Sequence, residues 1–148
     1  MHIQDYRTLY AKYLDQLHNE ILAIQSDEQL WALAPGVLNS CGNLGLHLAG
    51  NLRTFVGDVV GHSGYVRDRD AEFQTKGLSR EQVAALIATA KQEVEAALMT
   101  LNDSDLVKPY PIDKFGADRS NGYVLLYLLG HLNYHLGQVN YLRRILSK

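Results

Sequence analysis

Apolar residues recur at intervals of three and four over four long stretches of the chain, which is the pattern of amphipathic helices. In the first stretch, residues 3–24, charged residues such as Asp5 occupy the positions between them. The apolar stripe consists of Ile3, Tyr6, Tyr10, Tyr13, Leu17, Ile21 and Ile24. We expect one long helix here, then a further turn at residues 27–33 and a break at Pro35-Gly36.

The second stretch is predicted to be a helix that begins at Asn39 or Ser40, either of which can cap it, and runs to about Val60. Its apolar face includes Leu44, Leu48, Leu52, Phe55 and Val59. A polar stripe at steps of four runs beside that face and contains Asn43, His47 and Asn51. Because buried polar groups need partners, this stripe indicates contacts beyond ordinary packing.

The third helix, predicted over residues 79–101, begins with a capping box formed by Ser79 and Gln82. It contains no histidine, and we expect it to serve as scaffold. The last helix follows Ser120, another capping residue, and includes residues 123–142. Its apolar residues cover more than one face, which favours a dimer, and they are Leu125, Leu128, Leu129, Leu132, Leu136 and Val139.

Two long connections, residues 61–77 and 102–120, separate the last three helices. Connections of more than about 12–15 residues are uncommon in compact domains and often are binding loops or crossovers that span a bundle. Residues 67–70 alternate Arg and Asp, which fits either a solvated loop with local ion pairs or a segment that orders the entrance of a site. The pattern predicts an all-α fold, a four-helix bundle with long crossover loops, as a single domain over residues 1–148.

Composition narrows the classes of function. The formal net charge is -2 and basic residues are scattered, so we expect no nucleic-acid partner. Residues 29–52 and 120–142 are free of charge and long enough to cross a bilayer, but both carry histidines and amides, so we expect no membrane span. The only cysteine, Cys41, cannot form an internal disulfide, and the N-terminus lacks the apolar core of a signal peptide. We therefore expect a cytoplasmic protein.

His131 and His135 are the strongest signal for chemistry. Residues four apart on a helix lie on one face, about 5–6 Å apart at Cβ, which suits two ligands of one metal ion. With His47 they would form a three-histidine site that leaves a tetrahedral ion one open position. The alternative is that these are core histidines satisfied by hydrogen bonds. His18 and His62 are expected to lie at the surface.

The residues between the two histidines are Leu132, Asn133 and Tyr134, so the motif supplies no glutamate base of the HExxH type. A metal-bound water would need a base from elsewhere, such as the loop from Asp68 to Glu72. A thiol substrate depends less on such a base, because binding to the metal ion itself deprotonates the thiol. This favours a thiol-dependent transfer over hydrolysis.

Three stretches resemble the DinB-like superfamily: NLGLHLAGNL around His47, RDRDAEF at residues 67–73 and GHLNYHLGQVNYLRRIL at 130–146. The first two resemble its DUF1572 branch in particular. The resemblance implies an up-down-down-up bundle, usually a homodimer, with a divalent ion such as nickel or zinc held by three histidines. At the matching positions these ligands are His47, His131 and His135.

Members of that superfamily include transferases and isomerases that use low-molecular-weight thiols, so the resemblance implies a small-molecule substrate and such a thiol. Asn51 and Gln138, each near a histidine along its helix, are candidates to contact the ligands or the substrate. Three alternatives to a thiol transferase stay open. They are a non-catalytic metal-binding or stress-response protein, a dimeric helical interaction module and a metal-dependent hydrolase.

Overall fold

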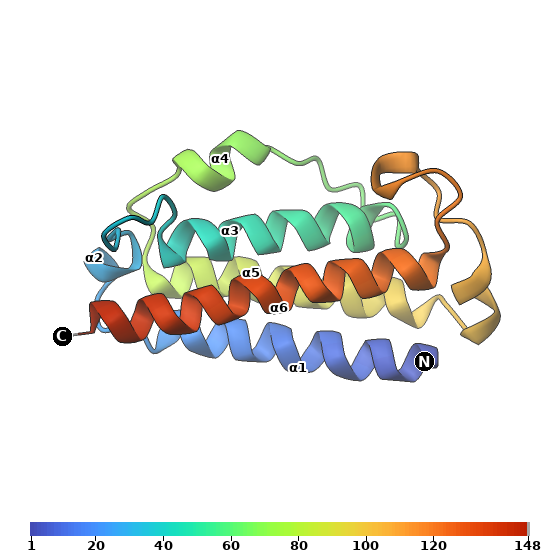
Figure 1. Cartoon of the computed structure of the whole chain (residues 1–148), viewed down its shortest axis with the longest axis horizontal. Helices are drawn as coiled ribbons and strands as arrows, with labels where there is room; N and C mark the ends of the chain where they lie inside the picture. Colours follow the sequence, from blue (N-terminus) through green and yellow to red (C-terminus); the bar gives the residue numbers. More distant parts are fainter. Residues whose placement is uncertain (148) are drawn as a thin grey trace.

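The computed structural model describes residues 1–147 and contains four long helical segments (Figure 1). These are α1 (Ile3–Leu22), α3 (Cys41–Leu52) with its continuation η1 (Arg53–Asp58), α5 (Arg80–Met99) and α6 (Asn121–Leu146). Within the described residues there is no strand, only one isolated β-bridge between Pro109 and Ser120. The predicted all-α fold is confirmed.

The helices form an up-down-down-up bundle in which α1 and α6 run one way and α3 and α5 run the other (Figure 1). α1 packs against α5 and α6, and α3 packs against the same two helices from the opposite side. The second and third helices are parallel, so the chain must return along the whole bundle between them. That return is the crossover, residues 61–79, which carries the short helix α4 (Arg69–Gln74) over the outer side of α3.

The remaining elements are short and cap the ends of the bundle. They are α2 (Asp27–Leu30) and the two 3-10 helices η2 (Asp103–Val107) and η3 (Asp113–Phe115). Tyrosines tie the long helices to each other: Tyr10 is fully buried on α1 and donates its hydroxyl to the carbonyl of Leu125 on α6 at 2.6 Å.

The helix boundaries follow the predicted caps closely. Ser40, Ser79 and Ser120 each accept a hydrogen bond from the backbone N–H three residues on. The α-helical part of the second helix ends earlier than predicted, because residues 53–58 widen into a π-helix. Along α1, Leu14 is buried and Tyr13 lies only at the edge of the core.

The outer position of the crossover explains the polar stripe on α3. All twelve residues of α3 are buried, because other helices cover one side and the crossover covers the other. The amide of Asn43 donates to the carbonyls of Glu72 and Thr75, at 3.0 Å each. Asn43 and His47 of this stripe are therefore the residues that bind the crossover.

Candidate metal centre

The structure brings His47, His131 and His135 together between α3 and α6, with one ring nitrogen of each within 4.8 Å of the others. Nε2 of His47 and Nε2 of His131 are 3.2 Å apart. His131 and His135 lie one turn apart on α6, with ring centroids at 4.6 Å, and His47 faces both. His47 is buried and the other two are half-buried.

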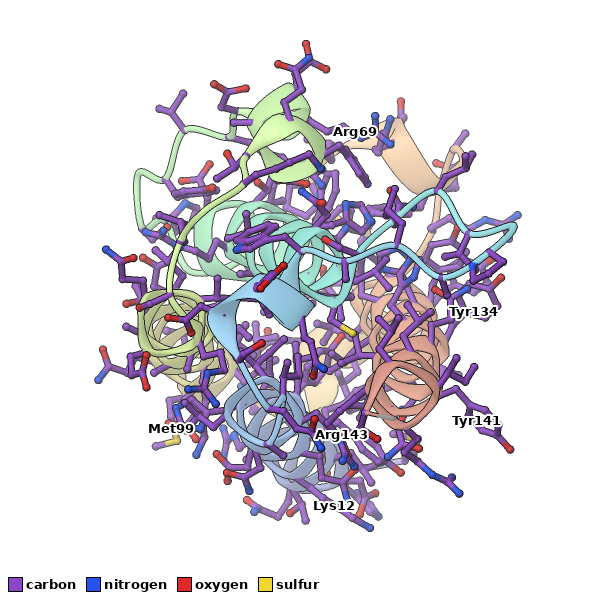
Figure 2. The ribbon with its side chains drawn as sticks, turned by 90° about the vertical axis from the view of Figure 1, so that its left-hand side faces the viewer. Lys12, Arg69, Met99, Tyr134, Tyr141 and Arg143 are labelled. Carbon is purple, nitrogen blue, oxygen red and sulfur yellow. The ribbon has the colours of Figure 1, made fainter. Side chains whose placement is uncertain are left out.

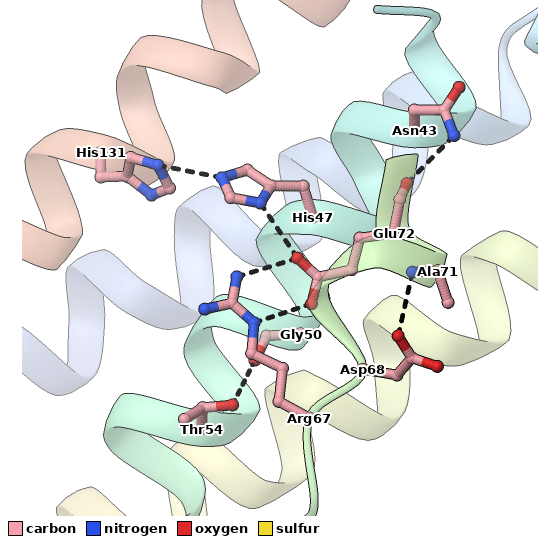
Figure 3. Close-up of polar contacts among 9 residues, drawn as sticks. All are labelled: Asn43, His47, Gly50, Thr54, Arg67, Asp68, Ala71, Glu72 and His131. Atoms are coloured by element: carbon pink, nitrogen blue, oxygen red, sulfur yellow. Dashed lines mark hydrogen bonds and ion pairs between the residues drawn. The ribbon is translucent and has the colours of Figure 1, made fainter. Parts of the chain in front are cut away.

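The ring of His47 is fixed from behind by Glu72, which α4 carries (Figure 3). Nδ1 of His47 lies 3.0 Å from one carboxylate oxygen of Glu72. Arg67 then donates two hydrogen bonds of 2.8 Å to that carboxylate, one to each oxygen. This contact sets Nδ1 of His47 as the donor and directs Nε2 toward His131.

The ring of His135 is fixed in the same way from within α6. Its Nδ1 lies 2.6 Å from Oε1 of Gln138, so Nδ1–H donates to the amide oxygen and Nε2 carries the lone pair. Gln138 therefore contacts His135, which the sequence analysis proposed as a ligand. Asn51 is buried, but its Oδ1 has no hydrogen-bond partner among the described residues, and it touches none of the three rings by a hydrogen bond.

Burial is the main influence on the pKa values of His131 and His135. Burial, followed by the nearby His135, His47 and Arg67, lowers the pKa of His131 from 6.5 to about 4. Burial also lowers the pKa of His135, against the opposing hydrogen bond to Gln138. Burial would raise the pKa of Glu72, but hydrogen bonds from His47 and Arg67 outweigh it and hold that pKa below its usual value. These shifts favour the unprotonated form of His131 and His135, which is the form that binds metal.

The donor set fits a divalent ion. A metal–nitrogen distance of about 2.0–2.1 Å in a tetrahedral site corresponds to nitrogen–nitrogen separations of about 3.3 Å. The separation of 3.2 Å between His47 and His131 already has this length. A carboxylate that accepts the other N–H of a ligand histidine is the usual outer support of such sites. Glu72 has that relation to His47, and the amide oxygen of Gln138 takes the corresponding position for His135.

Gly50 on α3 leaves room for the side chain of Glu72 from the crossover. A Cβ added to Gly50 would lie 2.0 Å from Oε2 of Glu72, so any larger residue at that position would displace the carboxylate. Gly50 therefore allows α4 to approach α3 closely enough for Glu72 to reach His47.

A pocket of about 460 Å³ opens beside the histidine cluster, on the outer side of α6. It is lined by Tyr123, Leu126, Tyr127, Gly130, His131 and Tyr134. His131 is the member of the cluster that borders it. A small molecule in this pocket would therefore meet the ring of His131.

The remaining histidines of interest and the cysteine lie outside the histidine cluster. His62 is exposed, His18 is half-buried on α1, and neither belongs to the group of histidines. Cys41 is buried, and burial raises the pKa of its thiol to about 12, which makes it unreactive at neutral pH. No helix within residues 1–147 combines the length and the apolar character needed to cross a membrane.

Arg67 and Glu72 are the site residues that sequence reasoning did not single out. The prediction treated the loop from Asp68 to Glu72 as a source of a free base or as an entrance, whereas Glu72 is buried and paired on both sides. The one signal for these two residues was in the order of the sequence. A stretch rich in charged residues follows an uncharged stretch that carries His47. Asp68 and Asp70, by contrast, are exposed.

Comparisons with known proteins agree with this architecture. The model of the family described as "Protein of unknown function (DUF1572)" matches residues 1–148, and the chain belongs to this family. A crystal structure of a DinB-like protein from Bacillus cereus ATCC 10987 matches with a TM-score of 0.77 and 20% identity, over 99% of this chain and 93% of that one. This match identifies a DinB-like helical bundle. No curated protein matches.

Proposed function

We propose that this protein is a metal-dependent enzyme in which His47, His131 and His135 hold one divalent ion, nickel or zinc, for a thiol-dependent transfer to a small molecule. The observation that carries the proposal is the convergence of three imidazoles, two of which are oriented by a hydrogen bond at Nδ1. Glu72 holds His47 and Gln138 holds His135. Both rings therefore present Nε2 to the same point.

The ion, when bound, lowers the pKa of a coordinated thiol so that the thiolate exists at neutral pH. The chain's own residues supply the rest. His47 and His135 stay oriented because their Nδ1 protons are bound, and burial excludes water from the inner side of the cluster. The pocket beside His131, lined mainly by tyrosine and leucine, suits an electrophile with an apolar part.

Glu72 also bears on the choice between transfer and hydrolysis. A hydrolase needs a general base that can take a proton from water. Both oxygens of Glu72 accept hydrogen bonds from Arg67, and one also contacts His47, so this carboxylate is already committed. A thiol needs no such base once coordinated, which favours the transferase over the metal-dependent hydrolase. The reaction would belong in the cytoplasm, where low-molecular-weight thiols are kept reduced.

The direct test is the metal content of natively purified protein and of its variants. We expect near one equivalent of metal per chain in the parent and loss of it in His131→Ala and in His135→Ala. His62→Asn is the matched control, because His62 is exposed outside the cluster and asparagine tolerates its positive φ. Folded parent protein that fails to bind added Ni²⁺, Zn²⁺ or Mn²⁺ would contradict the metal site.

The thiol step has its own test. Protein loaded with Co²⁺ is titrated with bacillithiol, mycothiol or glutathione, and we expect sulfur coordination to appear as an intense charge-transfer band in the near ultraviolet. Retained metal without this band for any of these thiols would support a non-catalytic metal-binding protein.

The contact of 3.2 Å between His47 and His131 also suits an N–H···N hydrogen bond, which is the geometry of a histidine core without a metal. That arrangement corresponds to the helical interaction module. It predicts that His131→Ala changes only packing, and that the parent and the variant respond alike to added metal.

A further inference from the structure

The inner face of α6 is apolar except at the histidines. Tyr134 and Tyr141 point away from the bundle (Figure 2), whereas the leucines on which the sequence analysis based a dimer are buried inside it and form no surface. Among residues 1–147, two buried side-chain atoms have no hydrogen-bond partner, and both belong to the helices that carry the histidines. They are Nδ1 of His131 and Oδ1 of Asn51. Because nearly all buried polar atoms in proteins are paired, these two need an explanation.

His131 differs from the other two histidines at the second nitrogen of its ring. Nδ1 of His47 lies 3.0 Å from Glu72, and Nδ1 of His135 lies 2.6 Å from Gln138. Nε2 of His131 faces His47, and its Nδ1 is turned away from that ring (Figure 3). A neutral imidazole that binds a metal ion through Nε2 carries its proton on Nδ1, and such histidines almost always donate this proton to an acceptor. His131 is therefore the histidine that still needs an acceptor.

Asn51 lies level with His131 across the contact between α3 and α6. Near the start of α3, Sγ of Cys41 is 3.7 Å from the carbonyl oxygen of Val139. Further along α3, His47 faces His131, so the two helices are antiparallel. Asn51 is one turn beyond His47 and is displaced toward the start of α6. Helical side chains lean toward the N-terminus of their own helix, so in this antiparallel pair Asn51 and His131 lean toward each other.

We propose that Asn51 is the positioning residue of His131, and that its Oδ1 accepts a hydrogen bond from Nδ1–H of that ring, directly or through one water, when Nε2 binds the metal ion. The inference rests on the metal site of the proposed function but not on its thiol step. It gives each ligand an acceptor at Nδ1, from the crossover, from α6 and from α3. An amide oxygen suits this buried position because it accepts the proton without burying a further charge.

Metal affinity and the stability of chelator-treated protein together test this role. Asn51→Leu keeps the branched shape of the side chain and removes the oxygen. We expect its affinity for Zn²⁺, in competition with a chelator, to fall by about 10- to 100-fold. Without metal, the variant should unfold at the same urea concentration as the parent or at a higher one, because it lacks a buried oxygen that has no partner. A residue needed only for packing would give lower stability and unchanged affinity.

A conservative variant and a matched control complete the set. Asn51→Asp keeps an oxygen in the same place, so its affinity for Zn²⁺ should match or exceed that of the parent. Asn121→Leu is the control, because Asn121 is also buried but donates to the carbonyl of Asp105 at the start of α6, away from the histidines. We expect it to lose stability and to keep the affinity of the parent.

The proton on Nδ1 can be observed by NMR of protein that contains isotope-labelled histidine and is loaded with Zn²⁺. Long-range proton–nitrogen spectra distinguish the two nitrogens of each ring. We expect Nδ1 to be protonated in His47, His131 and His135. In Asn51→Leu the Nδ1–H signal of His131 should move upfield, because its acceptor is lost, and the signals of the other two rings should stay in place.

Failure of the metal site and failure of this inference give different results. A parent that does not bind Zn²⁺ would contradict the site and the role of Asn51 together. A parent that binds Zn²⁺ no more tightly than Asn51→Leu would overturn only the role of Asn51. Equal loss of affinity in Asn51→Leu and Asn51→Asp would also overturn it, because the second variant retains an acceptor.

Discussion

Glu72 is a buried carboxylate with partners on two sides, and both partners act on its charge. Arg67 supplies a positive charge through two parallel hydrogen bonds, and His47 supplies an N–H. Such a pair would add little at the surface, but here both side chains are largely buried, at 15% and 6% exposure. The negative charge of Glu72 therefore lies where it can raise the basicity of the His47 ring and make it a stronger ligand.

We expect Glu72→Gln to weaken metal binding by about 10- to 100-fold while the ion still binds. Glutamine keeps an oxygen for the Nδ1 proton of His47 but removes the charge that raises the basicity of the ring. The measurement is competition for Zn²⁺ or Ni²⁺ with a chelator of known affinity.

Glu93→Gln is the matched control. Glu93 makes the same two-bond pair with Arg53, at 2.9 Å for each bond, but contacts no histidine. Its loss should affect stability without affecting metal affinity. Equal affinity of the parent and of Glu72→Gln would show that Glu72 has only a structural role.

We expect the stability of the metal-free protein to fall as the pH drops from about 6.5 to about 4. The pKa of His131 is lowered to about 4 by burial and nearby positive charge. In this window the unfolded chain takes up a proton that the folded protein does not, so the free energy of unfolding decreases. One pKa unit corresponds to about 1.4 kcal/mol, so His131 contributes at most about 3 kcal/mol.

Urea denaturation between pH 4 and 7.5 measures this effect. The pH dependence should be weaker in His131→Asn and unchanged in His62→Asn. His135 adds to the trend in the same direction, because burial lowers its pKa too. If His131→Asn keeps the full pH dependence, another group is responsible for it.

The sequence pointed to the histidines and to Gln138 but not to Glu72 and Arg67, which support His47, and the difference is physical. His131 and His135 share a helix face by spacing alone, and a polar stripe on an apolar helix marked His47. The partner of His47 comes from a crossover 25 residues away, and nothing local in a run of alternating Arg and Asp shows which acid turns inward. Only the packing of α4 on α3 selects Glu72 over Asp68 and Asp70.

At the scale of elements, the crossover packs along α3 and holds the ring of His47 in place. Two contacts join it to α3, because Asn43 donates to its backbone and Glu72 reaches His47. Arg67 pairs with Glu72 within the crossover itself. The approach is close because Gly50 has no side chain in its path. The helix periods predicted the long helices well, whereas the π-helix at residues 53–58 has no sequence signal of its own and depends on tertiary contacts.

We expect Gly50→Ala to destabilise the protein by about 1–3 kcal/mol and to lower metal affinity. The new Cβ would lie 2.0 Å from Oε2 of Glu72, which must then move away from His47. This is the reverse of the usual effect in a helix, where alanine is favoured by about 1 kcal/mol. Urea denaturation and a chelator competition measure the two effects.

A double-mutant cycle isolates the clash. In the background of Glu72→Ala the obstructing carboxylate is gone, so Gly50→Ala should become neutral or stabilising. If Gly50→Ala costs the same in both backgrounds, the loss arises from contacts other than that with Glu72.

At the scale of the whole molecule, the apolar core lies apart from the candidate metal centre and can stabilise the fold without it. The centre of the bundle is filled by apolar side chains from all four long helices, with Leu14, Leu48, Ile87 and Leu132 almost fully buried. A core of this size in a chain of 148 residues supports folding without a bound ion. An ion held by the three histidines would touch only one side of the bundle, between α3 and α6, and would act as a ligand of a folded protein.

We therefore expect the metal-free protein to be folded and its melting temperature to rise with the concentration of added Zn²⁺ or Ni²⁺. A ligand at 100 times its dissociation constant adds about 2.7 kcal/mol to the free energy of unfolding, which corresponds to several degrees for a chain of this length. Circular dichroism of chelator-treated protein, followed by a metal titration, measures both parts. His131→Ala should fold but show no such rise, whereas a metal-free parent without helical structure would make the ion a structural element.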